Sequence, residues 1–142
     1  MAQIGFVASL SARVGLLLLV AGSPRAETDK YIAEMKPAES YAAGQQGTVD
    51  VTLTPKGGYH ISAGFPYYKF KAGDPPDGVT YPKTALSSAD FETSDGKGHF
   101  KFPFVAAHAG RFTVGGTFSF SLCSDANCVM GSVGLEVPVD VR

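Results

Sequence analysis

The residues of this chain best suited to chemistry are its two cysteines, Cys123 and Cys128, which are separated by four residues. They come at the end of a segment in which apolar and polar residues alternate, the pattern of a half-buried β-strand. Successive side chains of a strand point to opposite faces, so Cys123 falls on the face opposite the core. The core face carries Phe118, Phe120 and Leu122. The sequence therefore predicts a sulfur that a partner can reach.

The last strand of the chain fixes the direction of the second cysteine. Apolar residues occupy odd positions from Val133 to Val141, and the same phase directs Cys128 outward. Cys123 and Cys128 would then face each other across a tight hairpin, with Cα atoms about 4.5–5.5 Å apart, a separation that a disulfide accepts. A bulge at Gly131 is the arrangement that would shift this phase.

The start of the chain has the layout of a secretory signal peptide. Residues 1–26 contain no acidic residue, and Arg13 precedes a short apolar run at 14–21 that small and turn-forming residues follow. The run is short for a bilayer span. We therefore expect export, with a mature protein that is periplasmic or secreted, and two cysteines in such a protein usually pair.

The remainder is one domain of about 116 residues. It carries 10 Lys and Arg against 13 Asp and Glu, a net charge of about −3, which argues against a nucleic-acid partner or binding to an anionic membrane surface. It has no second long apolar segment, so we expect no membrane insertion of the mature chain.

A bond between the cysteines would close a loop of only six residues, worth about 2 kcal/mol of stability on chain-entropy grounds. Such a bond is either a local brace or a redox-active pair. The connector at 124–127 has no basic residue and includes Asp125, which disfavours a thiolate. The reduced cysteines should therefore be weak nucleophiles, and the disulfide would be attacked by a partner's thiolate.

The rest of the chain predicts an all-β fold. Period-two alternation recurs in six or seven short segments with turn-forming residues between them, which favours an immunoglobulin-like β-sandwich. Pro103 and Pro138 lack a ladder donor, so we expect their strands at edges or bulged. The predicted organisation is a signal peptide at 1–26, an extended lead-in at 27–46 and a sandwich domain at 47–142.

Three segments resemble the amino-terminal periplasmic (alpha) domain of the thiol:disulfide interchange protein DsbD, over roughly residues 45–142. They are 58–62 (GYHIS), 100–105 (FKFPFV) and 118–128 (FSFSLCSDANC). The chain departs from that family in having four residues between its cysteines instead of five. It also has His60 and Ser62 where the family has tyrosines.

The resemblance implies an immunoglobulin-like fold with a redox-active pair, here Cys123 and Cys128, on a terminal hairpin. It implies a thioredoxin-like protein or domain as the partner that reduces this pair. It also implies a cap loop with a shielding phenylalanine. By order along the chain, the cap-loop candidates are Asp90, Phe91 and Glu92.

Two functional hypotheses remain open. In the first, the protein is an exported thiol–disulfide exchange module that shuttles electrons between a thioredoxin-like donor and extracytoplasmic partners. In the second, it is a non-catalytic binding or adaptor domain with a structural hairpin disulfide. A soft-metal site made by the two cysteines with Met130 and His60 is disfavoured, because the spacing is not that of a metal motif. We expect no metal and no cofactor.

Overall fold

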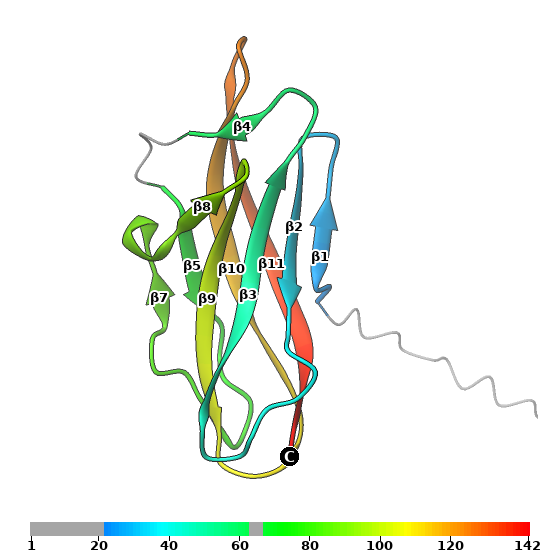
Figure 1. Cartoon of the computed structure of the whole chain (residues 1–142), viewed down its shortest axis with the longest axis vertical. Coiled ribbons are helices and arrows are strands. Elements are labelled where there is room, and N and C mark those ends of the chain that lie inside the picture. The colour runs from blue at the N-terminus through cyan, green and yellow to red at the C-terminus, as the bar shows by residue number, and fades with distance from the viewer. Residues whose placement is uncertain (1–21, 63–66) are drawn as a thin grey trace, which may run out of the picture.

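The computed structural model describes residues 22–62 and 67–142, which form two antiparallel sheets packed face to face (Figure 1). The fold is thus an all-β sandwich, as the alternation predicts, and its only helical turn among these residues is η1 (Ser88–Asp90). The six-stranded sheet contains β1 (Arg25–Glu27), β2 (Tyr31–Lys36), β3 (Gln46–Pro55), β6 (Val79–Thr80), β8 (Glu92–Ser94) and β9 (Lys97–Ala106). The five-stranded sheet contains β4 (His60–Ile61), β5 (Lys69–Ala72), β7 (Ala85–Leu86), β10 (Gly110–Cys123) and β11 (Cys128–Val141).

Strand order explains how the sheets are built. The first runs β1-β2-β3-β9-β6, with β8 also paired to β9, and the second runs β11-β10-β5-β7, with β4 also paired to β10. β10 is thus central in its sheet, whereas β11 is an edge strand. None of the described segments forms a helix with the length and hydropathy needed to span a bilayer.

The core between the sheets is rich in phenylalanine. These rings come from the alternating positions that the sequence assigned to core faces, and burying each one contributes about 1.5–3 kcal/mol. The fully buried phenylalanines are Phe70, Phe100, Phe102, Phe104, Phe118 and Phe120. They fix which face of β10 turns inward, and so which face carries the cysteine.

The β10–β11 hairpin is the longest feature of the fold, with 14 residues in each strand. Pairing is continuous from Gly110 opposite Val141 to Cys123 opposite Cys128, so there is no bulge at Gly131 and the predicted phase is confirmed. A Cβ atom on Gly131 would lie 2.5 Å from the Phe120 ring. The glycine therefore makes room for that ring without disturbing the ladder.

The segment expected as an extended lead-in contributes strands to the sandwich. β2 pairs with β3, and its Ala33 and Met35 are buried in the core. Alternation there is weak in the sequence because alanine is a weak hydrophobic signal and charged residues flank Met35. Most of the predicted signal peptide, residues 1–21, lies outside the described residues, while its last two residues, Arg25 and Ala26, belong to β1.

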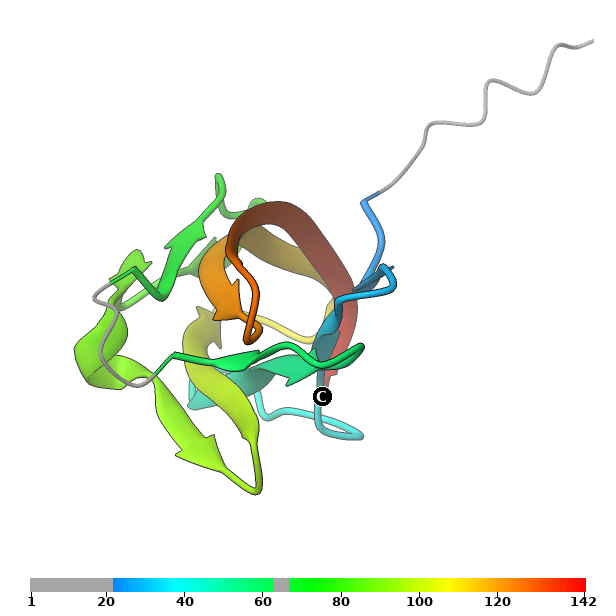
Figure 2. The same cartoon turned by 90° about the horizontal axis from the view of Figure 1, so that it is seen from above.

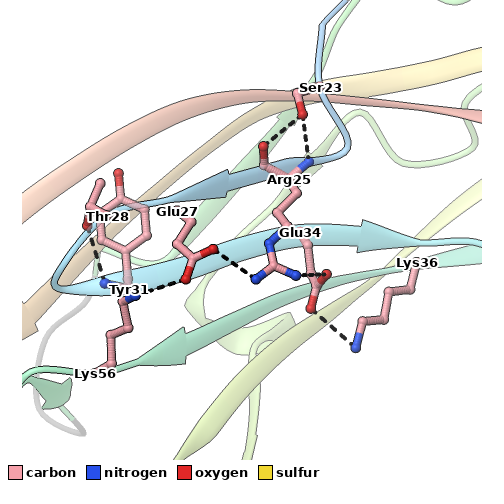
Figure 3. Close-up of polar contacts among 8 residues, drawn as sticks. All are labelled: Ser23, Arg25, Glu27, Thr28, Tyr31, Glu34, Lys36 and Lys56. Atoms are coloured by element: carbon pink, nitrogen blue, oxygen red, sulfur yellow. Dashed lines mark hydrogen bonds and ion pairs between the residues drawn. The ribbon is translucent and has the colours of Figure 1, made fainter.

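Charged side chains line the outer edge formed by β1 (Figure 3). Glu27 accepts hydrogen bonds from Lys56 and Arg25, both at 2.9 Å. These bonds lower the pKa of its carboxyl group, and the bond from Lys56 has the larger effect. Glu34 pairs with Lys36 at 3.2 Å. Exposed pairs of this kind add little stability, but charges on an edge strand discourage pairing with another chain.

The two prolines expected at strand edges or bulges, Pro103 and Pro138, occupy positions where a missing hydrogen-bond donor is tolerated. Pro138 is on the edge strand β11, as expected. Pro103 is on β9, which lies inside its sheet, but the second side of β9 pairs with β8 only up to His99 and with β6 only from Val105. Pro103 thus lies in a stretch of β9 that has one neighbouring strand, β3.

Candidate functional site

The two cysteines form a disulfide at the tip of the β10–β11 hairpin. Cys123 ends β10 and Cys128 begins β11, and they are directly opposed, with Cα atoms 4.0 Å apart, slightly closer than expected. The tip projects beyond the rest of the sandwich at the top of Figure 1. Cys128 is exposed and Cys123 is half-buried. Of the two residues, Cys128 is therefore the more accessible to an incoming group.

Hydrogen bonds hold the four-residue connector in place. The Ser124 backbone N–H donates to the Asn127 carbonyl at 2.7 Å, and the Ser124 hydroxyl donates to Asn127 Oδ1 at 3.0 Å. The Tyr59 hydroxyl donates to the same Oδ1 at 2.9 Å. These bonds tie the tip to the segment before β4. The two cysteine backbones are thus positioned by contacts other than the disulfide.

A third strand brings a histidine beside the disulfide. β4 pairs with the end of β10, so that His60 lies directly opposite Cys123 and Ile61 opposite Leu122. Directly opposed side chains in an antiparallel pair project from the same face. His60, Cys123 and Cys128 therefore form one row across β4, β10 and β11, and Figures 1 and 2 both show β4 beside the hairpin.

A shallow recess lies next to this row. It is lined by His60 and Ile61 from β4 and by residues 93–96 of the β8–β9 turn. Asp95 and Gly96 form that turn with positive φ angles of 52° and 74°, as a tight Asp-Gly hairpin requires. The recess thus joins the disulfide end of one sheet to a turn of the other.

Tyr68 supports the site from inside. Its hydroxyl donates to the Ser121 carbonyl at 2.8 Å and accepts from the Ser62 backbone N–H at 2.9 Å. The side chain is 4% exposed, and burial raises the pKa of its phenol. Ser121 is two residues before Cys123, so this phenol links the chain that follows β4 to the strand that carries the disulfide.

Of the cap-loop candidates, Phe91 packs against that support. Its ring stacks on Tyr68 with centroids 4.3 Å apart and planes 12° apart, and also contacts Phe100 at 4.9 Å. Gly98 provides the space, because a Cβ atom there would overlap the Phe91 ring. Phe91 is thus connected to the disulfide strand through the Tyr68 hydroxyl.

The two acidic cap-loop candidates contact basic side chains close by. Asp90 accepts hydrogen bonds from Lys83 at 2.7 Å and from the Ser87 backbone N–H at 3.0 Å. These bonds lower the pKa of its carboxyl group, and the bond from Lys83 has the larger effect. Glu92 pairs with His99 across β8 and β9 at 3.1 Å. The structure thus places both carboxylates in the scaffold around Phe91.

The soft-metal alternative considered from the sequence uses sulfurs that are bonded to each other in this structure. Within 22–62 and 67–142, no three His, Cys, Asp or Glu side chains gather in a group that could hold a metal ion.

Sequence reasoning missed the part of the site that lies outside the connector. It treated His60 as a possible metal ligand and as a departure from the DsbD pattern, and it did not assign Tyr59 or Tyr68 to the disulfide. The one available signal was the resemblance of 58–62 to the DsbD segment that carries tyrosines near its cysteine pair.

No family model matches the chain, and a search of curated proteins finds no match. The likeness to DsbD therefore rests on residues 58–62, 100–105 and 118–128, and the geometry of the site is the remaining guide to function.

Proposed function

We propose that this protein is an exported thiol–disulfide exchange module whose redox centre is the Cys123–Cys128 disulfide. The observation that carries the proposal is the position of the bond, at the projecting tip of a hairpin with the Cys128 side exposed. Disulfide exchange requires in-line access of a thiolate to one sulfur, and a bond buried among the phenylalanines would deny it.

The exchange reaction follows from the difference in exposure. A thiolate of the partner attacks the Cys128 sulfur, the bond between the two cysteines breaks, and Cys123 leaves with the electron pair as a thiolate. The second thiol of the partner, once deprotonated, then displaces Cys128 from the mixed disulfide. The partner dithiol is oxidised to a disulfide, and this protein receives two electrons and holds two reduced cysteines.

The scaffold suits repeated cycling. The connector bonds between Ser124 and Asn127 and the bond from Tyr59 remain available when the disulfide opens. The loop closed by the disulfide has six residues, so the bond adds only about 2 kcal/mol of stability. Loss of the bond should therefore leave the hairpin register intact.

The finer parts of the proposal rest on the resemblance to DsbD and on the start of the sequence. They are an immunoglobulin-like type of sandwich, a thioredoxin-like donor, a cap-loop role for Asp90, Phe91 and Glu92, and a periplasmic or secreted location that follows a signal peptide. The disulfide itself is compatible with an oxidising compartment.

The alternative is an adaptor domain in which the disulfide only braces the hairpin. The hydrogen bonds that fix Ser124, Asn127 and Tyr59 favour this alternative, because they make the tip a rigid projection suited to binding.

The reduction potential separates the two functions. The protein is equilibrated with mixtures of reduced and oxidised glutathione, and the free thiols are trapped and counted by mass spectrometry. We expect a potential above about −300 mV, because structural disulfides lie below that value. A potential below it would reject exchange and leave the adaptor function.

A further inference from the structure

We propose that His60 stabilises Cys123 as the thiolate released in the exchange reaction, and so sets the order in which the two sulfurs react. This inference rests on the proposed exchange function and adds a specific residue to it. It starts from the pairing of β4 with β10, which places His60 directly opposite Cys123 on the face that carries the disulfide.

The geometry assigns different surroundings to the two sulfurs. Cys123 lies between His60 on β4 and Cys128 on β11, whereas Cys128 lies on the edge strand, where it is exposed. An imidazolium beside a sulfur favours its thiolate form. Cys123 is therefore the better leaving group, and attack on Cys128 is favoured both by access and by the charge that develops.

The step balances without another reactant. A thiolate of the donor dithiol forms a bond to the Cys128 sulfur, and the electron pair of the broken disulfide passes to Cys123. The imidazolium of His60 stabilises that negative charge or transfers a proton to it, which yields a neutral thiol and a neutral imidazole. The imidazole regains a proton from water before the next cycle.

Charged groups from three other segments lie around His60 and the cysteines. Asp95 lines the same recess from the β8–β9 turn. Tyr59 directly precedes His60 in the chain, and Lys30 Nζ lies over the Tyr59 ring, 5.8 Å from its centre. Asp125, in the connector, opposes a thiolate. Asp125 and His60 are both exposed to water, which screens both charges, so the difference between them is the pairing that places His60 opposite Cys123.

From the connector sequence alone, we expect the reduced cysteines to be weak nucleophiles. With His60 opposite Cys123, we expect Cys123 to be a better nucleophile than the connector predicts. The connector supplies one exposed carboxylate, whereas β4 supplies a histidine at a directly opposed position. Cross-strand neighbours have Cβ atoms about 4.5–5.5 Å apart, well within the range at which charge acts on a thiolate.

The test measures the thiolate of Cys123 by itself. In the Cys128→Ser protein, the rate of alkylation by iodoacetamide is recorded from pH 5 to pH 10, with and without His60→Gln. We expect the His60→Gln change to lower the rate about 3- to 10-fold at pH 6–7, below the ordinary pKa of a thiol, where the thiolate fraction limits the rate. Above about pH 9.5, where a thiol is deprotonated without help, the rate should be unchanged. His60→Lys, which keeps a cation, should restore the neutral-pH rate.

The matched control is His108→Gln, which removes a histidine from the β9–β10 turn at the opposite end of the sandwich. It should leave the alkylation profile unchanged. As a second measurement, the intact disulfide is reduced with dithiothreitol at pH 7, and His60→Gln should slow that reaction by a similar factor.

Identical alkylation profiles with and without His60 would overturn the inference, as would failure of His60→Lys to restore the rate. Neither result depends on the exchange function. That function is rejected separately if equilibration with glutathione gives a reduction potential in the range of structural disulfides. A disulfide that glutathione does not reduce would therefore reject the exchange function while the alkylation experiment still reports on His60.

Discussion

Reduction of the disulfide, without any mutation, is expected to lower the free energy of unfolding by only about 2 kcal/mol. The bond between Cys123 and Cys128 spans a sequence separation of 5, and the chain-entropy cost of closing a six-residue loop sets that size. The ladder, the connector bonds and the β4 pairing use no sulfur atom, so we expect them to remain when the disulfide opens and to add nothing to this loss of stability.

The same stabilisation of about 2 kcal/mol also limits how far folding shifts the reduction potential of the disulfide. Because 30 mV corresponds to about 1.4 kcal/mol for a two-electron couple, folding makes this disulfide only about 45 mV harder to reduce than in the unfolded chain. A bond of this kind can be opened by a dithiol donor without unfolding its carrier. The stability measurement is therefore also a test of the exchange function.

The assay is guanidinium unfolding of the oxidised protein and of the protein kept reduced with a phosphine, followed by intrinsic tyrosine fluorescence. The Cys123→Ser, Cys128→Ser double variant serves as a third sample that cannot re-form the bond and should match the reduced protein. A loss greater than about 4 kcal/mol, or a reduced protein that no longer folds, would show that the bond is a structural staple.

Three further predictions concern the face that carries the site and its support. Phe120→Ala should lower the free energy of unfolding in guanidinium by about 3–5 kcal/mol, because the ring is fully buried. Met130→Ala, on the exposed face of the same hairpin, should lower it by less than about 0.5 kcal/mol, and equal losses would contradict the strand phase. Phe91→Ala should speed reaction of the disulfide with small thiols, because it releases the stacked phenol that supports β10. An unchanged rate would reject any role of Phe91 in controlling access to the disulfide. Lys83→Met should raise the pKa of Asp90 toward its ordinary value, because the hydrogen bond from Lys83 is the main cause of the lowered pKa, and an NMR titration of the carboxyl carbon would show the change. The ionised carboxylate stabilises the fold above the ordinary pKa, and that stabilisation is lost as pH falls through the lowered pKa. In the variant it should therefore be lost at a higher pH.

Sequence patterning determined the sandwich and the orientation of its cysteines. Alternation is a local property of a strand, so the phase of Phe118, Phe120 and Leu122 was enough to direct Cys123 outward. The odd-numbered valines of the last strand did the same for Cys128, and the continuous ladder confirms both. The strand at Tyr31–Lys36 was missed because its buried positions include a small alanine.

Only the tertiary structure decided what surrounds the disulfide. His60 is 63 positions before Cys123 in the chain, and no local pattern links the two, because pairing between strands depends on how the whole sheet assembles. The same holds for the phenol of Tyr68, which reaches the Ser121 carbonyl across 53 positions. A disulfide can thus be predicted from two cysteines in one hairpin, whereas the histidine beside it comes from a strand that the fold brings from elsewhere.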